Sequence, residues 1–429
     1  MRKFTSFSEI HSSWKDNTGN ALIFDQDGVS SSMSYPELFE AVRTAAEKLR
    51  TAPGAQSCDP VRADHTPETV IRIFADVISG RDVLLADAEV SEEILESSGR
   101  RIDASPGDGQ EGRLFFFTSG TTSRSRLVTL TSRSLSCSAW SGQCMLPCGP
   151  EDTILSVLPL SHVFGFVCSM LWGLCYGASI ALGRGVRFLM EDCMYFDPTI
   201  LPAVPTIVEA LHRFHLLNPS LKTVLIGAAP CSEELTRALQ REGMKVYLGY
   251  GLTETSSGIA ITQDQDDPYG LVPCPGADIR IEEGGEISVA TPCLMEGYLG
   301  EDGAVTDGRF FTGDLGHIDP DGKLRLEGRK KDILVLSDGT KVFCPEYESE
   351  LMTVIGTKEI AVAQKAGRPV LVVSGDVDRS YVQEAVDHFN QLRQRSRQLA
   401  DIIYIQEPLP RTAVGKLRRW ELQQMLNRS

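Results

Sequence analysis

The sequence lacks a long uninterrupted apolar run, which limits where the protein can reside. The most apolar region lies between residues 153 and 182, but Pro159, His162 and several glycines interrupt it. We therefore expect a buried strand followed by a buried helix there, not a transmembrane segment. The first fifteen residues contain no continuous apolar stretch of the kind that a signal peptide needs. These absences predict a cytoplasmic protein.

Cysteine pairs with metal-ligand spacing are also missing. The chain has eleven cysteines and no C-x-x-C pair, and the closest two, Cys144 and Cys148, have no second pair to complete a zinc site. An odd number of scattered cysteines favours reduced, mostly buried thiols over a disulfide framework.

Positive charge is scarce, because the formal net charge is −16. Such an acidic balance argues against a nucleic-acid partner, which would need a broad basic face. The end of the chain differs, since residues 392–429 hold eight Lys or Arg against three Asp or Glu. This basic segment fits either a solvated helix face or a contact with an anionic ligand.

The organisation of the 429 residues indicates an α/β protein of two or three domains. Apolar strand patterns alternate with helical patterns from about residue 153 to 250, which is typical of layered, mostly parallel sheets. From about residue 268 the pattern changes to short strands with Glu-Gly-Gly and Pro-Asp-Gly turns, which predicts an antiparallel β-subdomain. We expect an N-terminal domain over 1–328 and a small mobile α+β domain over 329–429.

The segment 114–128, LFFFTSGTTSRSRLV, joins an apolar strand to a loop of hydroxyl residues, glycine and arginine. Successive backbone N–H groups, hydroxyls and a guanidinium are what a polyphosphate requires. A Ser/Thr-rich surface turn would look similar, so this segment alone does not decide.

Five further segments follow the loop in a fixed order. They are IGAAP (226–230), YGLTET (250–255), FFTGDLG (310–316), which we interpret as a turn carrying Asp314, GRKKD (328–332) and PRTAVGKLRR (410–419). Together with the loop, they resemble the adenylate-forming superfamily of acyl- and aryl-CoA synthetases, luciferases and peptide-synthetase adenylation domains. The resemblance runs from about residue 33 to the end of the chain, and the region before the loop looks shortened.

The resemblance implies that ATP activates a carboxylic acid as an acyl-adenylate, with release of pyrophosphate, before the acyl group passes to a thiol. Donors around the β- and γ-phosphates would come from the loop: Thr118, Ser119, Gly120, Thr121 and Thr122. Glu254 and Thr118 would hold Mg²⁺, and Thr253 would reach the α-phosphate. Lys416 would place its ammonium where negative charge builds up in the transition state.

The adenosine would contact another group of residues. Tyr250 would stack on the adenine, and Asp314 would accept hydrogen bonds from both ribose hydroxyls with help from Arg329. The remaining contacts would come from Gly227, Ala228, Ala229 and Gly251. Lys331 would be the hinge about which the C-terminal domain swings, a movement that would insert or withdraw the lysine.

The loop departs from the family pattern, TSGTTG followed by Lys-Gly. Ser123 replaces the last glycine, Arg126 the lysine and Leu127 the glycine after it. Arg126 keeps the positive charge and can bind phosphate through the paired N–H donors of its guanidinium. Ser123 reduces the backbone freedom that a glycine would give. These changes leave open a degenerate nucleotide-binding module with little turnover.

The segment LPLSHVFGF (158–166) resembles the part of fatty-acyl and aryl ligases that lies beside the acyl pocket. His162 would lie near the carboxylate, and Val163, Phe164 and Phe166 suit a hydrophobic acyl or aryl chain. No acidic residue occurs between 158 and 190, which disfavours a free amino acid as substrate. We expect coenzyme A as the thiol, with the phosphopantetheine arm of an acidic acyl carrier protein as the alternative.

Overall fold

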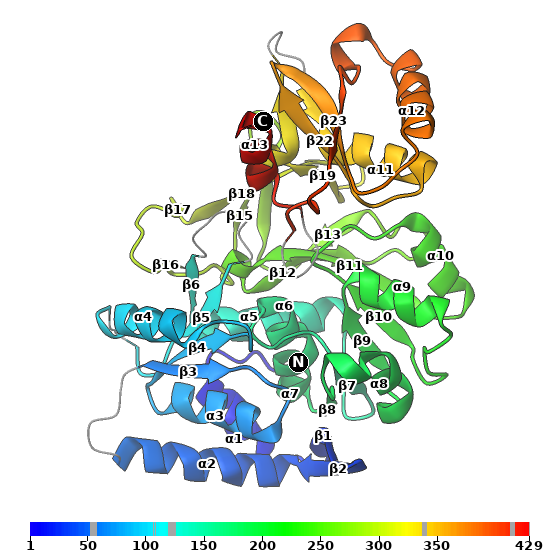
Figure 1. The fold of residues 1–429 in the computed structure, drawn as a ribbon. Coiled ribbons are helices and arrows are strands. Elements are labelled where there is room, and N and C mark those ends of the chain that lie inside the picture. The colour runs from blue at the N-terminus through cyan, green and yellow to red at the C-terminus, as the bar shows by residue number, and fades with distance from the viewer. Residues whose placement is uncertain are drawn as a thin grey trace.

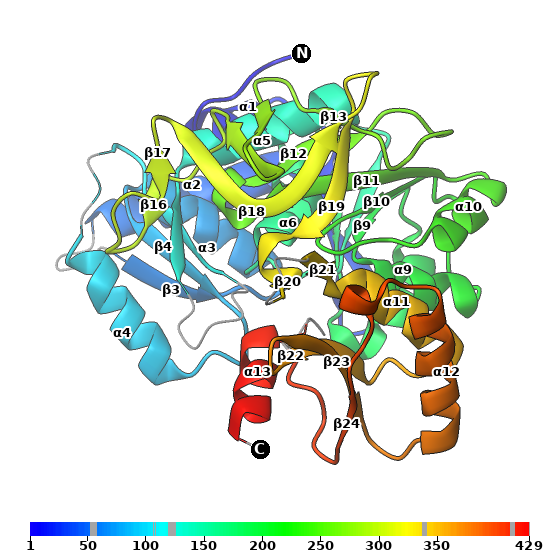
Figure 2. The same cartoon turned by 90° about the horizontal axis from the view of Figure 1, so that it is seen from above.

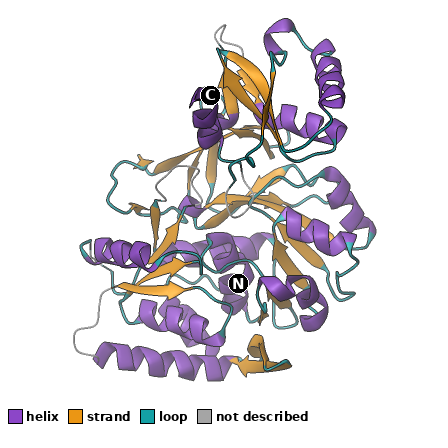
Figure 3. Ribbon diagram, viewed as in Figure 1, coloured by secondary structure: helices purple, strands orange, loops and turns teal. Residues whose placement is uncertain are grey.

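The computed structural model describes residues 1–51, 58–105, 107, 109–118, 126–336, 341–411 and 417–428, and it has the mixed α/β architecture expected from the sequence (Figures 1 and 3). Its largest sheet runs in the order β14-β15-β18-β19-β13-β12-β11-β10-β9-β7-β8-β1-β2, with β17 paired to β18. A second sheet runs β16-β6-β5-β4-β3, and two smaller sheets lie towards the C-terminus.

The middle of the large sheet is parallel. Its strands are β1 (Asn20–Gln26), β7 (Thr153–Ser156), β8 (Ser179–Leu182), β9 (Ile200–Ala203), β10 (Thr223–Ile226) and β11 (Lys245–Leu252), and β2 (Val29–Ser34) pairs antiparallel with β1 at the end. The carboxyl ends of these parallel strands therefore meet at one edge, where α/β proteins bind ligands.

Helices connect the parallel strands and cover the sheet. They are α6 (Val163–Phe166), the π-helical turn η1 (Val167–Leu171), α7 (Trp172–Tyr176), η2 (Val186–Phe188), α8 (Leu189–Phe196), α9 (Pro205–Arg213) and α10 (Glu233–Arg241). Helix α10 is capped at its N-terminus, because the Ser232 hydroxyl accepts a hydrogen bond from the Leu235 N–H.

The second sheet contains the strands on both sides of the phosphate loop. Its strands are β3 (Cys58–Arg62), β4 (Asp82–Ala86), β5 (Leu114–Phe117), β6 (Leu127–Leu130) and β16 (Gly297–Tyr298), of which β3, β4 and β5 are parallel. Helices α1 (Phe7–Trp14), α2 (Tyr35–Thr51), α3 (Pro67–Ile78), α4 (Glu92–Asp103) and α5 (Ser132–Met145) accompany it.

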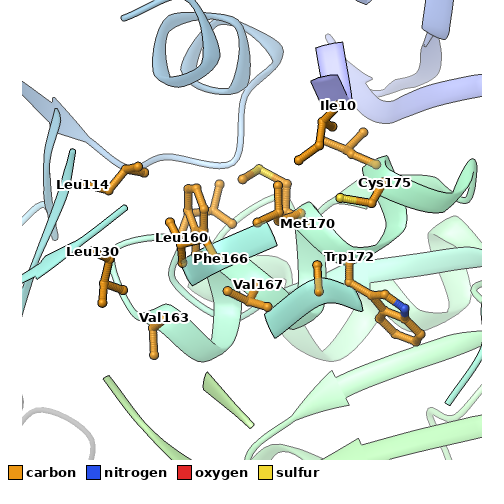
Figure 4. Close-up of a cluster of buried hydrophobic side chains, with 14 of the residues drawn as sticks. Ile10, Leu114, Leu130, Leu160, Val163, Phe166, Val167, Met170, Trp172 and Cys175 are labelled. Carbon is orange, nitrogen blue, oxygen red and sulfur yellow. The ribbon is translucent and has the colours of Figure 1, made fainter. Parts of the chain in front are cut away.

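One apolar core joins the two sheets (Figure 4). Phe166 is fully buried in it, 6.5 Å from the Phe7 ring and 5.5 Å from the Phe116 ring between centroids. Val163 is buried in the same cluster. The interpretation that Phe166 suits an acyl chain is therefore wrong, because the Phe7 and Phe116 rings surround it, whereas the same interpretation of Val163 and Phe164 stays a prediction.

The antiparallel strands expected after residue 268 are present, but they continue the large sheet. After β12 (Ser257–Thr262), which precedes residue 268, they are β13 (Leu271–Pro273), β14 (Asp278–Ile281), β15 (Glu286–Ala290), β17 (Val305–Thr306), β18 (Arg309–Ile318) and β19 (Leu324–Arg329). The junction is β11, which pairs parallel with β10 along its first half and antiparallel with β12 along its second half. In Figure 2 the long strand β18 arcs across the upper part of the view, and β19 runs back beside its right-hand end.

The remaining elements lie together at the top of Figure 1. They are η4 (Lys330–Asp332), β20 (Ile333–Val335), β21 (Lys341–Phe343), α11 (Cys344–Ile355), β22 (Ile360–Lys365), β23 (Arg368–Ser374), α12 (Arg379–Gln391), η5 (Arg395–Arg397), β24 (Ile402–Ile405) and α13 (Arg419–Arg428). Their buried side chains form hydrophobic clusters of their own. Across the described parts of the chain, none of the helices has the length and apolarity that a membrane crossing would require.

Candidate active site

The first group of predicted site residues to come together is Tyr250, Asp314 and Arg329. The Tyr250 hydroxyl donates to Asp314 Oδ2 at 2.9 Å, and Arg329 Nε lies 2.9 Å from Asp314 Oδ1. Asp314 and Arg329 are direct cross-strand partners on β18 and β19, so the sheet register itself makes the pair. The Asp314 residue is only 6% exposed. A carboxylate held this firmly, with a second lone pair on each oxygen, is a suitable acceptor for hydroxyl groups.

The predicted turn at Asp314 is wrong, because the residue lies inside β18. The cause is an irregularity in the pairing of β18 with β15, where Ser288 faces Phe311 but Glu286 faces Leu315. Extra residues on β18 are accommodated as a bulge, with Gly313 at φ +70°. The bulge re-aims the aspartate while the strand continues to its partner β19.

Burial keeps the Tyr250 hydroxyl protonated. Burial is the main cause that raises the Tyr250 pKa well above its usual range, and the neighbouring Asp314 carboxylate adds to the shift. Tyr250 therefore acts as a fixed donor to Asp314 at neutral pH.

The IGAAP segment follows β10 at the edge formed by the carboxyl ends of the strands. Gly227 is buried, whereas Ala228 and Ala229 are exposed. Ala228 has φ +65°, a left-handed conformation that is uncommon for a residue with a side chain and occurs at ligand-binding turns. A Cβ on Gly227 would lie 3.0 Å from the Phe164 ring, so this glycine allows Phe164 to approach the backbone closely.

The YGLTET segment leaves β11 and enters a single 3₁₀ turn, η3 (Thr253–Thr255). Gly251 is required here, since a Cβ would lie 1.8 Å from the Ser257 carbonyl oxygen on β12. The Thr255 hydroxyl fixes the turn by accepting from Leu252 N–H at 3.0 Å and donating to the Ser257 carbonyl at 2.8 Å. Thr253 and Glu254 are left half-buried at the end of the strand.

Glu254 has a partner that the sequence did not reveal. The Tyr298 hydroxyl on β16 donates to Glu254 Oε1 at 2.7 Å. Burial, and then the Glu254 carboxylate, raises the Tyr298 pKa well above its usual range, which preserves the hydroxyl as a donor. Tyr298 is brought near by the pairing of β16 with β6, a long-range contact that leaves no local sequence signal.

Arg126 completes this second group. Its guanidinium lies 4.7 Å from the centre of the Tyr298 ring, and its Nε lies 3.2 Å from Glu301 Oε2. Both partners of this ion pair are half-exposed, with 54% of the Arg126 side chain and 46% of the Glu301 side chain accessible. The cation predicted to bind phosphate is thus held beside the Glu254 and Tyr298 pair.

Thr118 and Arg126 close the base of the phosphate loop. Thr118 N–H donates to the Arg126 carbonyl at 2.9 Å, and Arg126 N–H donates to Thr118 Oγ1 at 3.2 Å. The other predicted loop residues, Ser119, Gly120, Thr121 and Thr122, lie outside the described residues, as does Lys416. Lys331, the predicted hinge, falls in η4, directly after β19, and its side chain is not described.

His162 stands at the N-terminus of α6, beyond the carboxyl end of β7. Its Nε2 lies 3.6 Å from Asp87 Oδ2, and Asp87 also accepts a short hydrogen bond from the Ser161 hydroxyl. The sequence analysis missed Asp87, although an acid directly after the buried strand β4 is a recognisable signal at this edge.

Comparison with known proteins identifies the family. The model of the family described as AMP-binding enzyme matches residues 62–299. The 2-succinylbenzoate–CoA ligase of Bacillus licheniformis is 30% identical over 335 residues, covering 71% of this chain and 68% of the relative. The long-chain-fatty-acid–CoA ligase 1 of Homo sapiens is 29% identical, covering 60% of this chain and 47% of the relative. The chain belongs to the AMP-binding enzyme family, which confirms the resemblance to adenylate-forming enzymes.

Solved structures show the same fold. The O-succinylbenzoate coenzyme A synthetase of Bacillus subtilis, solved in complex with AMP, superposes with a TM-score of 0.81 at 21% identity, covering 96% of this chain and 97% of that chain. The fold-class prediction is confirmed by this likeness. The curated relatives are named as CoA ligases, which agrees with the predicted acid–thiol ligase activity.

Proposed function

We propose that the protein uses ATP to convert a carboxylic acid to an acyl-adenylate, releases pyrophosphate, and transfers the acyl group to the thiol of coenzyme A. The observation that carries this proposal is the Tyr250, Asp314 and Arg329 cluster, which holds a buried carboxylate between β11, β18 and β19. A carboxylate with two fixed donors behind it suits the two hydroxyls of a ribose.

Charge neutralisation is the task of the second group. A carboxylate attacking the α-phosphate brings two anions together, so the site must supply positive charge and fixed donors. Glu254, oriented by Tyr298, is a hard oxygen ligand for the Mg²⁺ that would bridge phosphate oxygens. Arg126 and the loop that begins at Thr118 would face the β- and γ-phosphates, and Thr253 the α-phosphate.

We further propose that the C-terminal domain comprises residues 329–429, swings about Lys331 and carries Lys416 into the site. Asp332, the next residue after the hinge, accepts from Arg419 Nε at 2.8 Å, and Arg419 also pairs with Glu348 at 2.7 Å. These contacts tie α13 to η4 and α11. A rotation about Lys331 would therefore move Arg419, and the nearby Lys416 of the same chain segment, together with the rest of this domain.

The acid is proposed to be hydrophobic, either aryl or fatty acyl. Phe164 lies against Gly227, and the Cys168 thiol lies 3.4 Å from the Ser257 hydroxyl on β12. The Phe164 ring beside the IGAAP turn and the half-buried Cys168 thiol beside β12 give this region an apolar character. The names of the relatives, which include a succinylbenzoate and a long-chain fatty-acid ligase, support the same class.

The test is acid-dependent exchange of labelled pyrophosphate into ATP, with benzoate, 2-succinylbenzoate and straight-chain fatty acids in turn. We expect exchange with at least one acid, and thioester formation when coenzyme A is added. Lys416→Ala should slow exchange by about a hundredfold or more, because a charge contact in the transition state is lost. Exchange without a coenzyme A thioester would instead indicate the phosphopantetheine arm of a carrier protein, and no exchange with any acid would refute the proposal.

A further inference from the structure

Asp87, Ser161 and His162 form a cluster between the two sheets. Asp87 follows β4 of the second sheet, whereas Ser161 and His162 follow β7 of the large sheet. Ser161 is buried and donates to Asp87 Oδ1, and His162 Nε2 faces Asp87 Oδ2 at 3.6 Å. The Ser161 hydrogen bond holds one carboxylate oxygen, and the other oxygen faces the imidazole at a distance longer than a hydrogen bond.

The main chain of Asp87 is anchored as well. Arg62 donates from Nη1 to the carbonyl of Asp87 at 3.0 Å and to the carbonyl of Ala88 at 2.9 Å. The Val90 N–H donates to the same Asp87 carbonyl at 3.1 Å. Asp87 is therefore held through both its main chain and its side chain, which positions it to orient a neighbour.

The cluster lies within the proposed active site. Strands β4 and β5 pair with Leu85 opposite Phe116, so Asp87 and Thr118 are each two residues beyond this pair on adjacent strands. On the other side, Phe164, two residues after His162, packs against Gly227 at the end of β10. His162 therefore stands between the start of the phosphate loop and the IGAAP turn.

The His162 imidazole is partly exposed to solvent, whereas Asp87 is held by hydrogen bonds from Ser161 and Arg62. Of the side chains, 34% of His162 and 42% of Asp87 are exposed. His65 differs, because its Nε2 lies 3.0 Å from the Leu158 carbonyl and burial lowers its pKa. His162 is thus the imidazole at this edge that a reactant from solvent can reach.

We propose that His162 is the general base of the thiol-transfer step and that Asp87 is its positioning residue, an inference that rests on the proposed function. With Nε2–H turned to the Asp87 carboxylate, Nδ1 keeps its lone pair and can accept a proton. The thiol proton of coenzyme A passes to Nδ1, and the sulfur attacks the acyl carbonyl carbon. The new C–S bond replaces the C–O bond to the phosphate, and AMP leaves with that electron pair.

The need for a base follows from thiol chemistry. A thiol with a pKa near 8.5 is only a few per cent ionised at pH 7, and the thiolate is the nucleophile. Forming the adenylate requires no such base, because the attacking carboxylate is already ionised. The dyad should therefore act on the second half-reaction and not on the first.

The experiment measures the two half-reactions separately for the wild type, Asp87→Asn, Asp87→Glu and His162→Ala. Adenylate formation is followed by pyrophosphate exchange with whichever acid of the panel the wild type uses. The second step is followed by adding coenzyme A to preformed enzyme-bound adenylate and measuring the thioester by rapid quench. General-base catalysis contributes about a hundredfold or more, so we expect Asp87→Asn and His162→Ala to lower thioester formation at least tenfold more than exchange.

Two rescues separate chemistry from structure. Asp87→Glu should recover most of the thioester rate, and imidazole in the buffer should partly restore His162→Ala. Glu89→Gln, which removes an exposed negative charge two residues along the chain, is the matched control and should leave both steps unchanged.

The outcomes are distinct. Equal losses in both half-reactions, or no response to added imidazole, would overturn the dyad while leaving the proposed function in place. A wild type that forms no adenylate with any acid would overturn the proposed function and the dyad together.

Discussion

The two halves of the candidate site are held in different ways. On the nucleoside side, Asp314 is 6% exposed and is fixed by both Tyr250 and Arg329. On the phosphate side, Arg126 and Glu301 form an ion pair in which about half of each side chain is accessible to water. Buried hydrogen-bonded pairs are costly to break, whereas exposed ion pairs contribute little and exchange partners easily.

The difference fits the chemistry proposed for each half. The ribose is the same before and after the reaction, so a rigid acceptor suits it. The polyphosphate loses pyrophosphate during the reaction, so the cation that faces it must be able to engage and release. Glu301 pairs with Arg126 when no phosphate is bound, and breaking this exposed ion pair costs little free energy.

Asp314→Ala should produce the largest effect of the three changes that test this contrast. It removes the proposed acceptor for the ribose and the Asp314 partner of the buried Tyr250 hydroxyl, so ATP affinity should fall by roughly 5- to 150-fold, equivalent to about 1–3 kcal/mol. Isothermal titration with ATP measures it, and thermal unfolding verifies the fold. Asp321→Asn, in the turn of the same hairpin, is the control, and unchanged ATP affinity in Asp314→Ala would refute the ribose assignment.

Tyr298→Phe should have an intermediate effect, confined to the metal. Deleting the hydroxyl releases Glu254, and loss of a partner of a metal ligand typically costs about tenfold or more in metal affinity. The Mg²⁺ concentration that gives half-maximal pyrophosphate exchange should rise by about that factor. Tyr381→Phe, on the exposed face of α12, should leave the Mg²⁺ dependence as it is. If Tyr298→Phe does the same, Tyr298 does not position the metal ligand.

Glu301→Gln should have the smallest effect and the opposite sign. Removing the resting partner frees the Arg126 guanidinium, and an exposed ion pair is worth up to about 1 kcal/mol, so pyrophosphate should bind up to about fivefold tighter. The gain should shrink as salt rises and vanish in the Arg126→Ala background. A gain that persists without Arg126 would show that Glu301 acts by general repulsion.

The sequence predicted the grouping of Tyr250, Asp314 and Arg329 better than the grouping around Glu254 and Arg126. Tyr250, Asp314 and Arg329 come from motifs in fixed order, and the Pro-Asp-Gly turn implies that the two strands bearing Asp314 and Arg329 pair. The bulge that places Asp314 inside β18 was not predicted, because it depends on the register with β15. Family motifs show which residue stands at a position, but they do not show irregularities in how β-strands pair.

Tyr298 and Asp87 were missed for a different reason. Tyr298 reaches Glu254 through the pairing of β16 with β6, and Asp87 reaches His162 across two sheets. Contacts between segments so distant along the chain depend on tertiary packing, which periodicity does not encode. The same limit explains why Phe166 was interpreted as an acyl contact although it belongs to the core.

The closed base of the phosphate loop has a practical consequence for protein engineering. Thr118 and Arg126 are joined by two hydrogen bonds that use the main chain of both residues and the Thr118 hydroxyl. Residues 119–125 can therefore be swapped as a cassette between Thr118 and position 126, and the backbone of position 126 keeps its bonds even when its side chain is changed. Transplanting the glycine-rich version into this frame would isolate what Ser123 contributes to turnover, with the scaffold held constant.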